Sequence, residues 1–428
     1  MAENIVSVIG NTPLVSLNKL FKERPNRIFA KLEASNPGGS IKDRSALSII
    51  QQGLRTGRLH AKSVVIASSS GNMGIGLAQV CAYFDLHLIC VVDPKVTLQN
   101  LRLLEAYGAE VDMVLDPDEG GEYLKPRLAR VQALLRTHKN SFWPNQYSNL
   151  YAVKAHFTTM REIVLALNRQ VDYLFCSAST CGTLRGCVEY IRSHKLKTKV
   201  IAIDAVGSIL FGGKPAKRLL PGHGASVIPK LYRPNLADEV MMMSDLDCVI
   251  GCRRLVRKEG ILSGGSSGAV LMAFDRMKSE IPLDANCALI FPDRGERYLD
   301  TIYSDEWVEE HFGDVAHHWE KIVEVEEEAE VVEVMAKAKA KAKAKAMARA
   351  KVAAKIAAKV AADAAEVAAE VAARATEVAA KVAADAAEVA AAVAAEVTME
   401  ATETTKAAEV EKAAAVEKVD EEECMTVM

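Results

Sequence analysis

The chain has 428 residues, of which half are apolar and 5% aromatic, and its formal net charge is −3. This length allows two or three domains with a sizeable core, and the near-neutral charge predicts no general affinity for nucleic acids or membranes. No run of 18 uncharged apolar residues occurs, so no membrane span is expected. Nine scattered cysteines without a C-x-x-C pair, and no leader-like N-terminus, predict reduced core thiols in a cytoplasmic protein.

The charge is unevenly divided along the chain. Residues 321–428 carry 15 Lys+Arg against 22 Asp+Glu, which leaves about +4 for residues 1–320. A mildly basic core suits anionic ligands. We therefore expect a core at 1–320, followed by a tail of different composition at 321–428.

Between about residues 5 and 310, short apolar runs alternate with helical patterns. This alternation predicts an α/β fold with parallel sheets covered by helices, in which ligands lie at the carboxyl ends of the strands. The expected strands are 63–67, 87–92, 110–115, 171–176 and 199–204, and the expected helices are 44–54, 74–83, 98–107, 123–137 and 183–194.

The segment 36–44 (NPGGSIKDR) places a single lysine, Lys42, behind a Pro-Gly-Gly turn and ahead of a helix. Glycines let the backbone approach a flat ring closely, and the turn and the helix fix the amine in position. Such a lysine suits a Schiff base with a carbonyl group. A surface lysine on an ordinary turn is the alternative for this segment taken alone.

Three loops of small residues precede expected helices. Residues 68–74 (SSSGNMG) and 177–183 (SASTCGT) follow expected strands, and 264–269 (GGSSGA) is a third such loop. Backbone N–H groups and hydroxyls at a helix N-terminus can bind a carboxylate or a phosphate. A plain helix cap explains the first two loops about equally well.

Together these stretches, with GNTPL at 10–14, resemble the fold-type II pyridoxal-phosphate enzymes of the cysteine synthase superfamily. The resemblance covers about residues 5–310. It implies two parallel-sheet α/β domains, a smaller lobe at about 45–150 and a larger one at about 5–40 and 151–310. It also implies a homodimer that binds pyridoxal 5'-phosphate through Lys42 and acts on amino acids.

The resemblance also implies roles for individual residues. Asn72 contacts the ring hydroxyl of the cofactor, and Ser266 meets its pyridine nitrogen, an arrangement that suits β-elimination and replacement. The phosphate loop of the family departs from its usual pattern here at two glycines. Its positions are Ser179, Thr180, Cys181, Gly182 and Thr183, and the substrate carboxylate is held by Ser69, Ser70 and Gly71 with Gln146 of the next strand.

Other features resemble a narrower branch, the siderophore (staphyloferrin B) pathway enzymes that form N-(2-amino-2-carboxyethyl)-L-glutamate, a 2,3-diaminopropionate precursor. They are Tyr147, Ser179 and the segments 204–215, 221–226 and 292–300, with Gly222 as a further substrate contact. This branch replaces the phosphate of O-phospho-L-serine by the amine of L-glutamate through an α-aminoacrylate. Cysteine synthase, with O-acetylserine or O-phosphoserine and sulfide, is the alternative. An inactive homologue that binds partners through its tail is an alternative of another class.

Two further features are open to more than one interpretation. Arg127 is a weak candidate for binding the leaving phosphate, and a solvated helix face is the favoured explanation. His311, His317 and His318 lie near two glutamates, yet a solvated helix end is the expected explanation, and no metal is predicted.

The tail lacks Gly, Pro and aromatic residues after Trp319 and contains an 11-residue repeat. Eleven residues make three turns at 3.67 residues per turn, so the repeat predicts a long Ala-rich helix with one nearly straight valine stripe. A solvated extension without chemistry and a self-association or surface-binding helix both fit. The repeat is marked by Ile356, Val367, Val378 and Val389, by Val360, Val371, Val382 and Val393, and by Glu366, Glu377 and Glu388.

Overall fold

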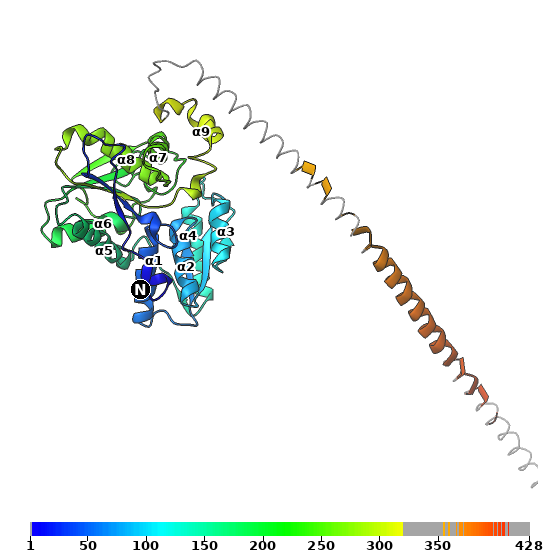
Figure 1. The fold of residues 1–428 in the computed structure, drawn as a ribbon. Helices are drawn as coiled ribbons and strands as arrows, with labels where there is room; N and C mark the ends of the chain where they lie inside the picture. Colours follow the sequence, from blue (N-terminus) through cyan, green and yellow to red (C-terminus); the bar gives the residue numbers. More distant parts are fainter. Residues whose placement is uncertain are drawn as a thin grey trace, which may run out of the picture. The chain divides into compact units, whose positions relative to one another are not determined.

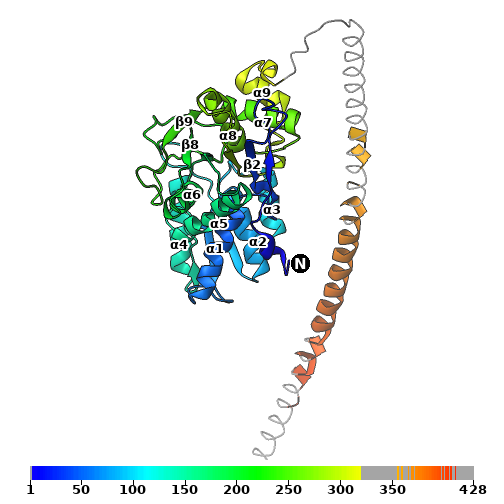
Figure 2. The ribbon, with the colours of Figure 1, turned by 60° about the vertical axis from the view of Figure 1, so that its left-hand side comes forward.

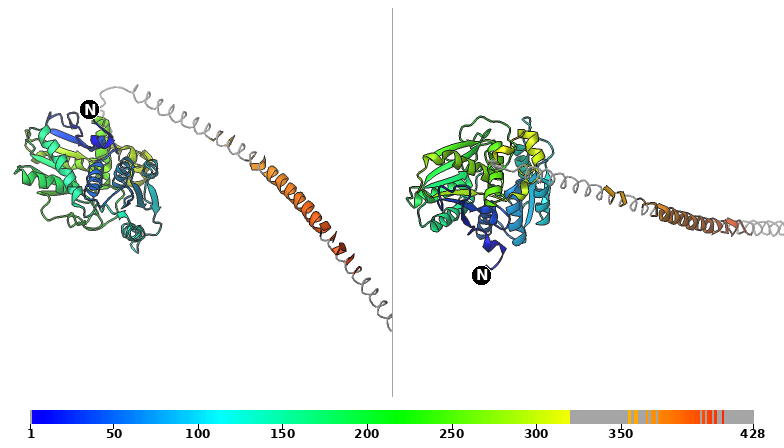
Figure 3. Two further views of the ribbon diagram at one scale, coloured as in Figure 1. Left: turned by 90° about the horizontal axis from the view of Figure 1, so that it is seen from below. Right: turned by 45° about the horizontal axis from the view of Figure 1, so that its top comes forward.

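Two β-sheets, each covered by helices, form the N-terminal part of the chain (Figure 1). The computed structural model describes residues 2–319, and then 354–355, 358–359, 365, 368–370, 372–396, 398–399, 401–403, 405–406 and 410. The chain divides into two units, Met1–Ile322 and Val323–Met428. Figure 3 shows the first unit from two further directions.

The smaller sheet has four strands, all parallel. Its side chains alternate between two faces, as the pleat requires. Val65 and Ala67 pack into the main core, whereas Ile66 packs against Val131 and Leu134 of helix α4. The strands in spatial order are β5 (Glu110–Met113), β4 (His87–Val92), β3 (Val64–Ser68) and β6 (Ser141–Phe142), and the helices along them are α2 (Asn72–Tyr83), α3 (Leu98–Ala106) and α4 (Leu124–Thr137).

The larger sheet has six strands, and β8 and β9 lie side by side at one edge (Figure 2). The first strand, β1, runs antiparallel to β2, whereas all other neighbours in this sheet are parallel, so the larger sheet is mixed with one antiparallel edge strand. A short connection joins β1 to β2, and a connection of that kind returns the chain beside itself in the opposite direction. In spatial order the strands are β1 (Leu14–Ser16), β2 (Ile28–Leu32), β10 (Cys287–Phe291), β7 (Tyr173–Ser177), β8 (Lys199–Ala205) and β9 (Glu239–Met243).

Helices cover both faces of the larger sheet, which explains why its strands β7, β8 and β10 are largely buried on both sides. On β7, Leu174 and Cys176 face the core shared with α5 and α6, whereas Phe175 faces the core of α7 and α8. Phe175 meets Phe274 of α8 edge to face, with ring centroids 5.5 Å apart. The helices are α1 (Lys42–Arg55), α5 (Leu150–Ala166), α6 (Gly182–Ser193), α7 (Asp245–Glu259), α8 (Gly265–Met277) and α9 (Asp305–Phe312), and the short 3₁₀ turns are Ile5–Val8, Glu33–Ser35, Lys278–Glu280, Glu296–Tyr298 and Ala316–His318.

The five strands and five helices whose bounds were expected between residues 44 and 204 all form, with each end within two residues of its expected position. The eight cysteines in the described part of the chain are buried and unpaired, which agrees with the prediction of reduced core thiols. Among the described residues, no helix combines the length and the hydrophobicity that crossing a bilayer requires.

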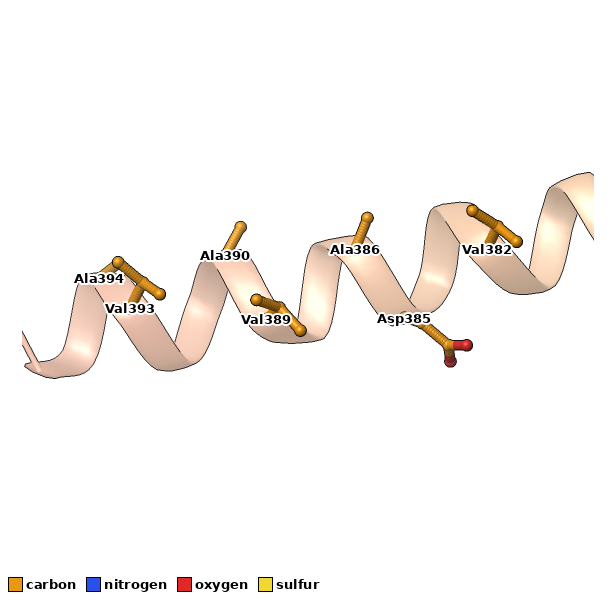
Figure 4. A pocket seen from close by; sticks show the side chains of 7 residues that line it. All are labelled: Val382, Asp385, Ala386, Val389, Ala390, Val393 and Ala394. Carbon is orange, nitrogen blue, oxygen red and sulfur yellow. The ribbon is translucent and has the colours of Figure 1, made fainter.

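The described part of the tail is helical and continuous from 372 to 396. Val378, Val382, Val389 and Val393 are between 53% and 63% exposed. Figure 4 shows Ala386 and Ala390 on the opposite side of this helix from Asp385. The helix and its valine stripe are therefore as the repeat predicts over these residues, whereas Ile356, Val360, Glu366, Val367 and Val371 lie outside the residues whose side chains are described.

Candidate active site

Lys42 is the first residue of α1, and a tight turn leads into it. The Gly39 N–H donates to the Asn36 carbonyl at 2.8 Å, and the Ile41 N–H donates to the Pro292 carbonyl at 2.8 Å. Gly39 has a φ of +84°, a left-handed conformation that glycine adopts without strain. These contacts fix the backbone from which the Lys42 side chain starts.

The environment of Lys42 favours a neutral amine. Burial lowers the pKa of Lys42, because the ammonium form loses its hydration, and the nearby Asp293 carboxylate opposes this shift. A neutral amine is the form that attacks a carbonyl carbon. Lys42 is also only partly exposed and lines a cavity, so the surface alternative is wrong.

The loop after β7 lies beside this amine. Residues 179–183, here called the cradle, line one cavity together with Lys42 and Gly222. They lead into the N-terminus of α6, where free backbone N–H groups and the helix dipole favour an anion. Cys181 caps α6 with a φ of +65°, a conformation that residues other than glycine rarely adopt. The Thr183 hydroxyl lies 3.3 Å from Nε2 of the buried His156.

The loop after β3 is shaped partly by its own serine. The Ser69 hydroxyl accepts the backbone N–H groups of Gly74 at 3.0 Å and Gly71 at 3.4 Å. Asn72 starts α2 and donates through Nδ2 to Asp293 Oδ2 at 2.7 Å. The loop thus presents Asn72 towards the end of β10, while Ser69 is engaged by the loop backbone.

Arg127 points from α4 to this same loop. Its Nη1 donates to the Ser70 hydroxyl at 2.9 Å, and its Nε lies 3.1 Å from Asp93 Oδ2. The side chains of Arg127 and Asp93 are only 14% and 6% exposed. The alternative of a solvated helix face is therefore wrong for Arg127. Asp93 follows β4 and is remote from Arg127 in sequence. No local sequence pattern therefore predicts this ion pair.

Tyr147 and Gln146 lie in the loop between β6 and α5. The expectation that Gln146 belongs to a strand is wrong, because β6 ends at Phe142 and Pro144 lacks the N–H that a ladder needs. Gln146 donates to the Ser68 carbonyl at 3.4 Å. Burial raises the pKa of Tyr147, against the opposing charge of Arg127.

Nine of the residues predicted from the sequence line two cavities. Lys42, the cradle (Ser179, Thr180, Cys181, Gly182 and Thr183) and Gly222 share one, whereas Gln146 and Tyr147 line a smaller one beside Ser68 and Met73. Tyr147 and Ser179, two of the features that resemble the narrower branch, thus line different cavities.

Ser266 is the second residue of α8 and is 3% exposed. A Cβ placed on Gly222 would lie 3.8 Å from the Ser266 hydroxyl. Because Gly222 also lines the Lys42 cavity, this glycine connects Ser266 with that cavity.

Three polar residues to which the sequence patterns assign no role gather around Asn72. Asp293 accepts from both Asn72 and the Tyr298 hydroxyl, the latter at 2.7 Å. Arg297 donates to Asn72 Oδ1 and to the Gly38 carbonyl. A signal does exist in the sequence, because the segment 292–300 directly follows the apolar strand β10 and so falls at the carboxyl edge of the sheet.

Comparison with known proteins places this geometry in a family. Residues 5–293 match the family described as pyridoxal-phosphate dependent enzyme. An N-(2-amino-2-carboxyethyl)-L-glutamate synthase of Ralstonia nicotianae is 45% identical over 309 residues, which cover 72% of this chain and 91% of that protein.

Solved structures agree with this match. A hydrogen sulfide-producing enzyme from Fusobacterium nucleatum is 34% identical, with a TM-score of 0.65 over 70% of this chain and 100% of its own. A cysteine synthase from Entamoeba histolytica is 30% identical, with a TM-score of 0.66 over 71% of this chain and 91% of its own. The chain belongs to the pyridoxal-phosphate-dependent enzymes of fold type II, in the cysteine synthase family.

Proposed function

We propose that this protein replaces the phosphate of O-phospho-L-serine by the amine of L-glutamate, giving N-(2-amino-2-carboxyethyl)-L-glutamate and inorganic phosphate. The Cβ–O bond breaks, and the phosphate leaves with its electron pair. The glutamate nitrogen forms a bond to Cβ and loses a proton. The observation that supports this most is that a partly buried lysine and the cradle line one cavity. The chain is also 45% identical to the Ralstonia synthase.

The residues present fit pyridoxal phosphate. Lys42 offers a buried amine for the covalent link, and the cradle offers helix N–H groups and hydroxyls for the phosphate. The resemblance assigns Asn72 to the ring hydroxyl and Ser266 to the ring nitrogen. When bound, the cofactor supplies an electron sink for the pair left on Cα after the α-proton departs. Once released from its covalent link, the Lys42 amine is the base in place to take that proton.

Arg127 supports the choice of a phosphorylated donor. Its guanidinium reaches the β3–α2 loop, where the resemblance puts the substrate carboxylate, and Asp93 and Ser70 hold it there. A fixed cation stabilises the negative charge that grows on a leaving phosphate. Acetate, which carries less charge, gains less from it.

The long loop from 206 to 238, between β8 and β9, supports an acidic nucleophile. It contains five basic residues and one acidic residue, Asp238, whose carboxylate accepts the Val200 N–H at 2.7 Å. The Gly224 N–H donates to the Ala178 carbonyl at 2.7 Å, and the Leu231 N–H donates to the Tyr147 carbonyl at 3.2 Å, which holds the loop over the end of β7. A one-signed charge near a site raises the local concentration of oppositely charged substrates. The basic residues are Lys214, Lys217, Arg218, Lys230 and Arg233.

A second candidate is cysteine synthesis from sulfide. It is favoured by the similarity to the Entamoeba and Fusobacterium structures. Both candidates share the chemistry at Lys42 and differ in the leaving group and the nucleophile. The basic loop is the feature that separates them, because sulfide needs no such surface.

Product analysis tests the choice. The enzyme is given O-phosphoserine or O-acetylserine, each with glutamate or sulfide, and products are identified by mass spectrometry. We expect the phosphoserine–glutamate pair to be used with the highest kcat/KM. Faster cysteine formation from acetylserine and sulfide, without a glutamate adduct, would make cysteine synthase the better assignment.

Variants of the loop provide a second test. Lys214→Gln with Lys217→Gln is expected to raise KM for glutamate and to weaken its salt dependence. Lys62→Gln, at the amino end of β3 and so at the opposite sheet edge, is the matched control and should change neither.

A further inference from the structure

We propose that Asp293 is a positioning residue of the cofactor pocket, which holds the Asn72 carboxamide in one orientation and so directs its free N–H towards the cofactor's ring oxygen. This inference rests on the proposed cofactor site but not on the identity of the amino-acid substrates.

Asp293 lies where three parts of the site meet. It follows β10 and pairs with Ser40, two residues before Lys42, in an isolated bridge. Its carbonyl accepts the Gly264 N–H at 3.3 Å, next to the loop of Ser266. The backbone of Asp293 is thus tied to the lysine turn and to the Ser266 loop. Its side chain reaches Asn72, the first residue of helix α2, which follows β3 of the smaller sheet.

The chemistry of the two partners decides which way the Asn72 amide faces. A carboxylate only accepts hydrogen bonds and a guanidinium only donates them. The atom facing Asp293 must therefore be Nδ2, and the atom facing Arg297 must be Oδ1. An amide between two hydroxyls would have no such constraint, because hydroxyls do both.

This orientation leaves one donor of Asn72 for the ligand. The amide nitrogen carries two hydrogens, and Asp293 takes one of them at 2.7 Å. The Tyr298 hydroxyl donates to the same carboxylate oxygen at 2.7 Å and fixes its position. A ring oxygen facing Asn72 can then accept the second hydrogen from an amide whose direction is already set.

Burial of Asp293 supports a functional role. The residue is 1% exposed, and its other oxygen, Oδ1, is buried without a hydrogen-bond partner among the described residues. Room for this oxygen exists because residue 264 is glycine, where a Cβ would lie 2.2 Å from Oδ1. A buried carboxylate with an unsatisfied oxygen is costly, so an apolar residue would serve stability alone better.

Cofactor analogues test the orientation without measuring turnover. The apoprotein is titrated with pyridoxal phosphate and with its 3-deoxy analogue, which lacks the ring oxygen. The ratio of the two dissociation constants reports the contact between Asn72 and that oxygen. We expect Asp293→Ala to reduce the preference for pyridoxal phosphate about tenfold, as Asn72→Ala does, with no further loss in the double variant.

The controls separate this role from others. Asp293→Asn keeps an acceptor oxygen and should restore most of the preference, whereas Asp284→Ala, an exposed aspartate before β10, should leave it unchanged. Affinity for the 3-deoxy analogue shows whether the pocket of each variant is folded. If Asp293→Ala does not fold, Asp293→Ser replaces it, because the shorter serine side chain cannot reach Asn72. Equal weakening of both ligands, or an unchanged ratio, would overturn the proposal. Loss of glutamate use with an intact ratio would count against the proposed reaction alone.

Discussion

Removing Arg127 should have two separable effects, one on stability and one on donor preference. The guanidinium pairs with Asp93 at 3.1 Å, and both side chains are largely buried. Arg127→Met leaves the Asp93 carboxylate without its cation. Deleting one partner of a buried pair costs about 3–5 kcal/mol, and we expect about 3 kcal/mol because Arg127 keeps some exposure.

The second effect concerns the leaving group. A charge-assisted hydrogen bond to phosphate contributes about 1.5–3 kcal/mol, so its loss from the transition state should lower kcat/KM for O-phosphoserine by about 10- to 150-fold. For O-acetylserine we expect a decrease of about threefold or less, because acetate carries less charge.

A double variant separates the two effects. Arg127→Met with Asp93→Asn removes the unpaired charge and should recover most of the lost stability, measured by urea unfolding. It should not recover the preference for phosphoserine, measured as phosphate and acetate release. If the double variant regains both, Arg127 acts only through the fold. If Arg127→Met keeps the full preference, the assignment of Arg127 to the leaving phosphate is refuted.

Three further predictions concern the lysine turn and the cradle. Lys42→Ala should lose the visible absorbance of the bound cofactor and all turnover. A variant that keeps either property would contradict the assignment of Lys42 as the residue that binds the cofactor covalently. Burial raises the pKa of Asp43 to about 7, so folding binds a proton and the unfolding free energy of the apoprotein should fall as pH rises from about 4 to 7. Asp43→Asn, which can still accept the Gly38 N–H, should reduce the difference in unfolding free energy between pH 5 and pH 8, measured by urea unfolding. An unchanged difference would contradict the assignment of this pH dependence to Asp43. Cys181→Val should destabilise the protein by more than about 1 kcal/mol, because β-branched residues rarely adopt a φ of +65°. Thermal unfolding measures this change, and a melting temperature equal to that of the wild type would contradict the expected strain at residue 181.

The tail illustrates how a repeat can predict an element but not its use. The 11-residue period predicts a helix with aligned valines, and the helix is continuous over 372–396. Its exposed valines are available to a second copy or to a surface, and the period alone fits both. A contact depends on the partner's surface, which the repeat does not encode.

The sequence by itself determined the elements and located the candidate site residues along the chain. Period-2 and helical patterns are local, so they located strands such as His87–Val92 and placed Lys42 at a helix start. The turn chemistry of 36–44 and the small-residue loops were likewise readable, since caps and turns depend on near neighbours.

Only the tertiary structure decided how these pieces meet. The bond between Asn72 and Asp293 joins residues 221 positions apart, and Arg127 reaches Ser70 across 57 positions. It also decided that Tyr147 and Ser179 line different cavities. Such pairings depend on strand order and on how the helices pack on the sheets, and no single segment carries that information because each partner alone is compatible with many neighbours.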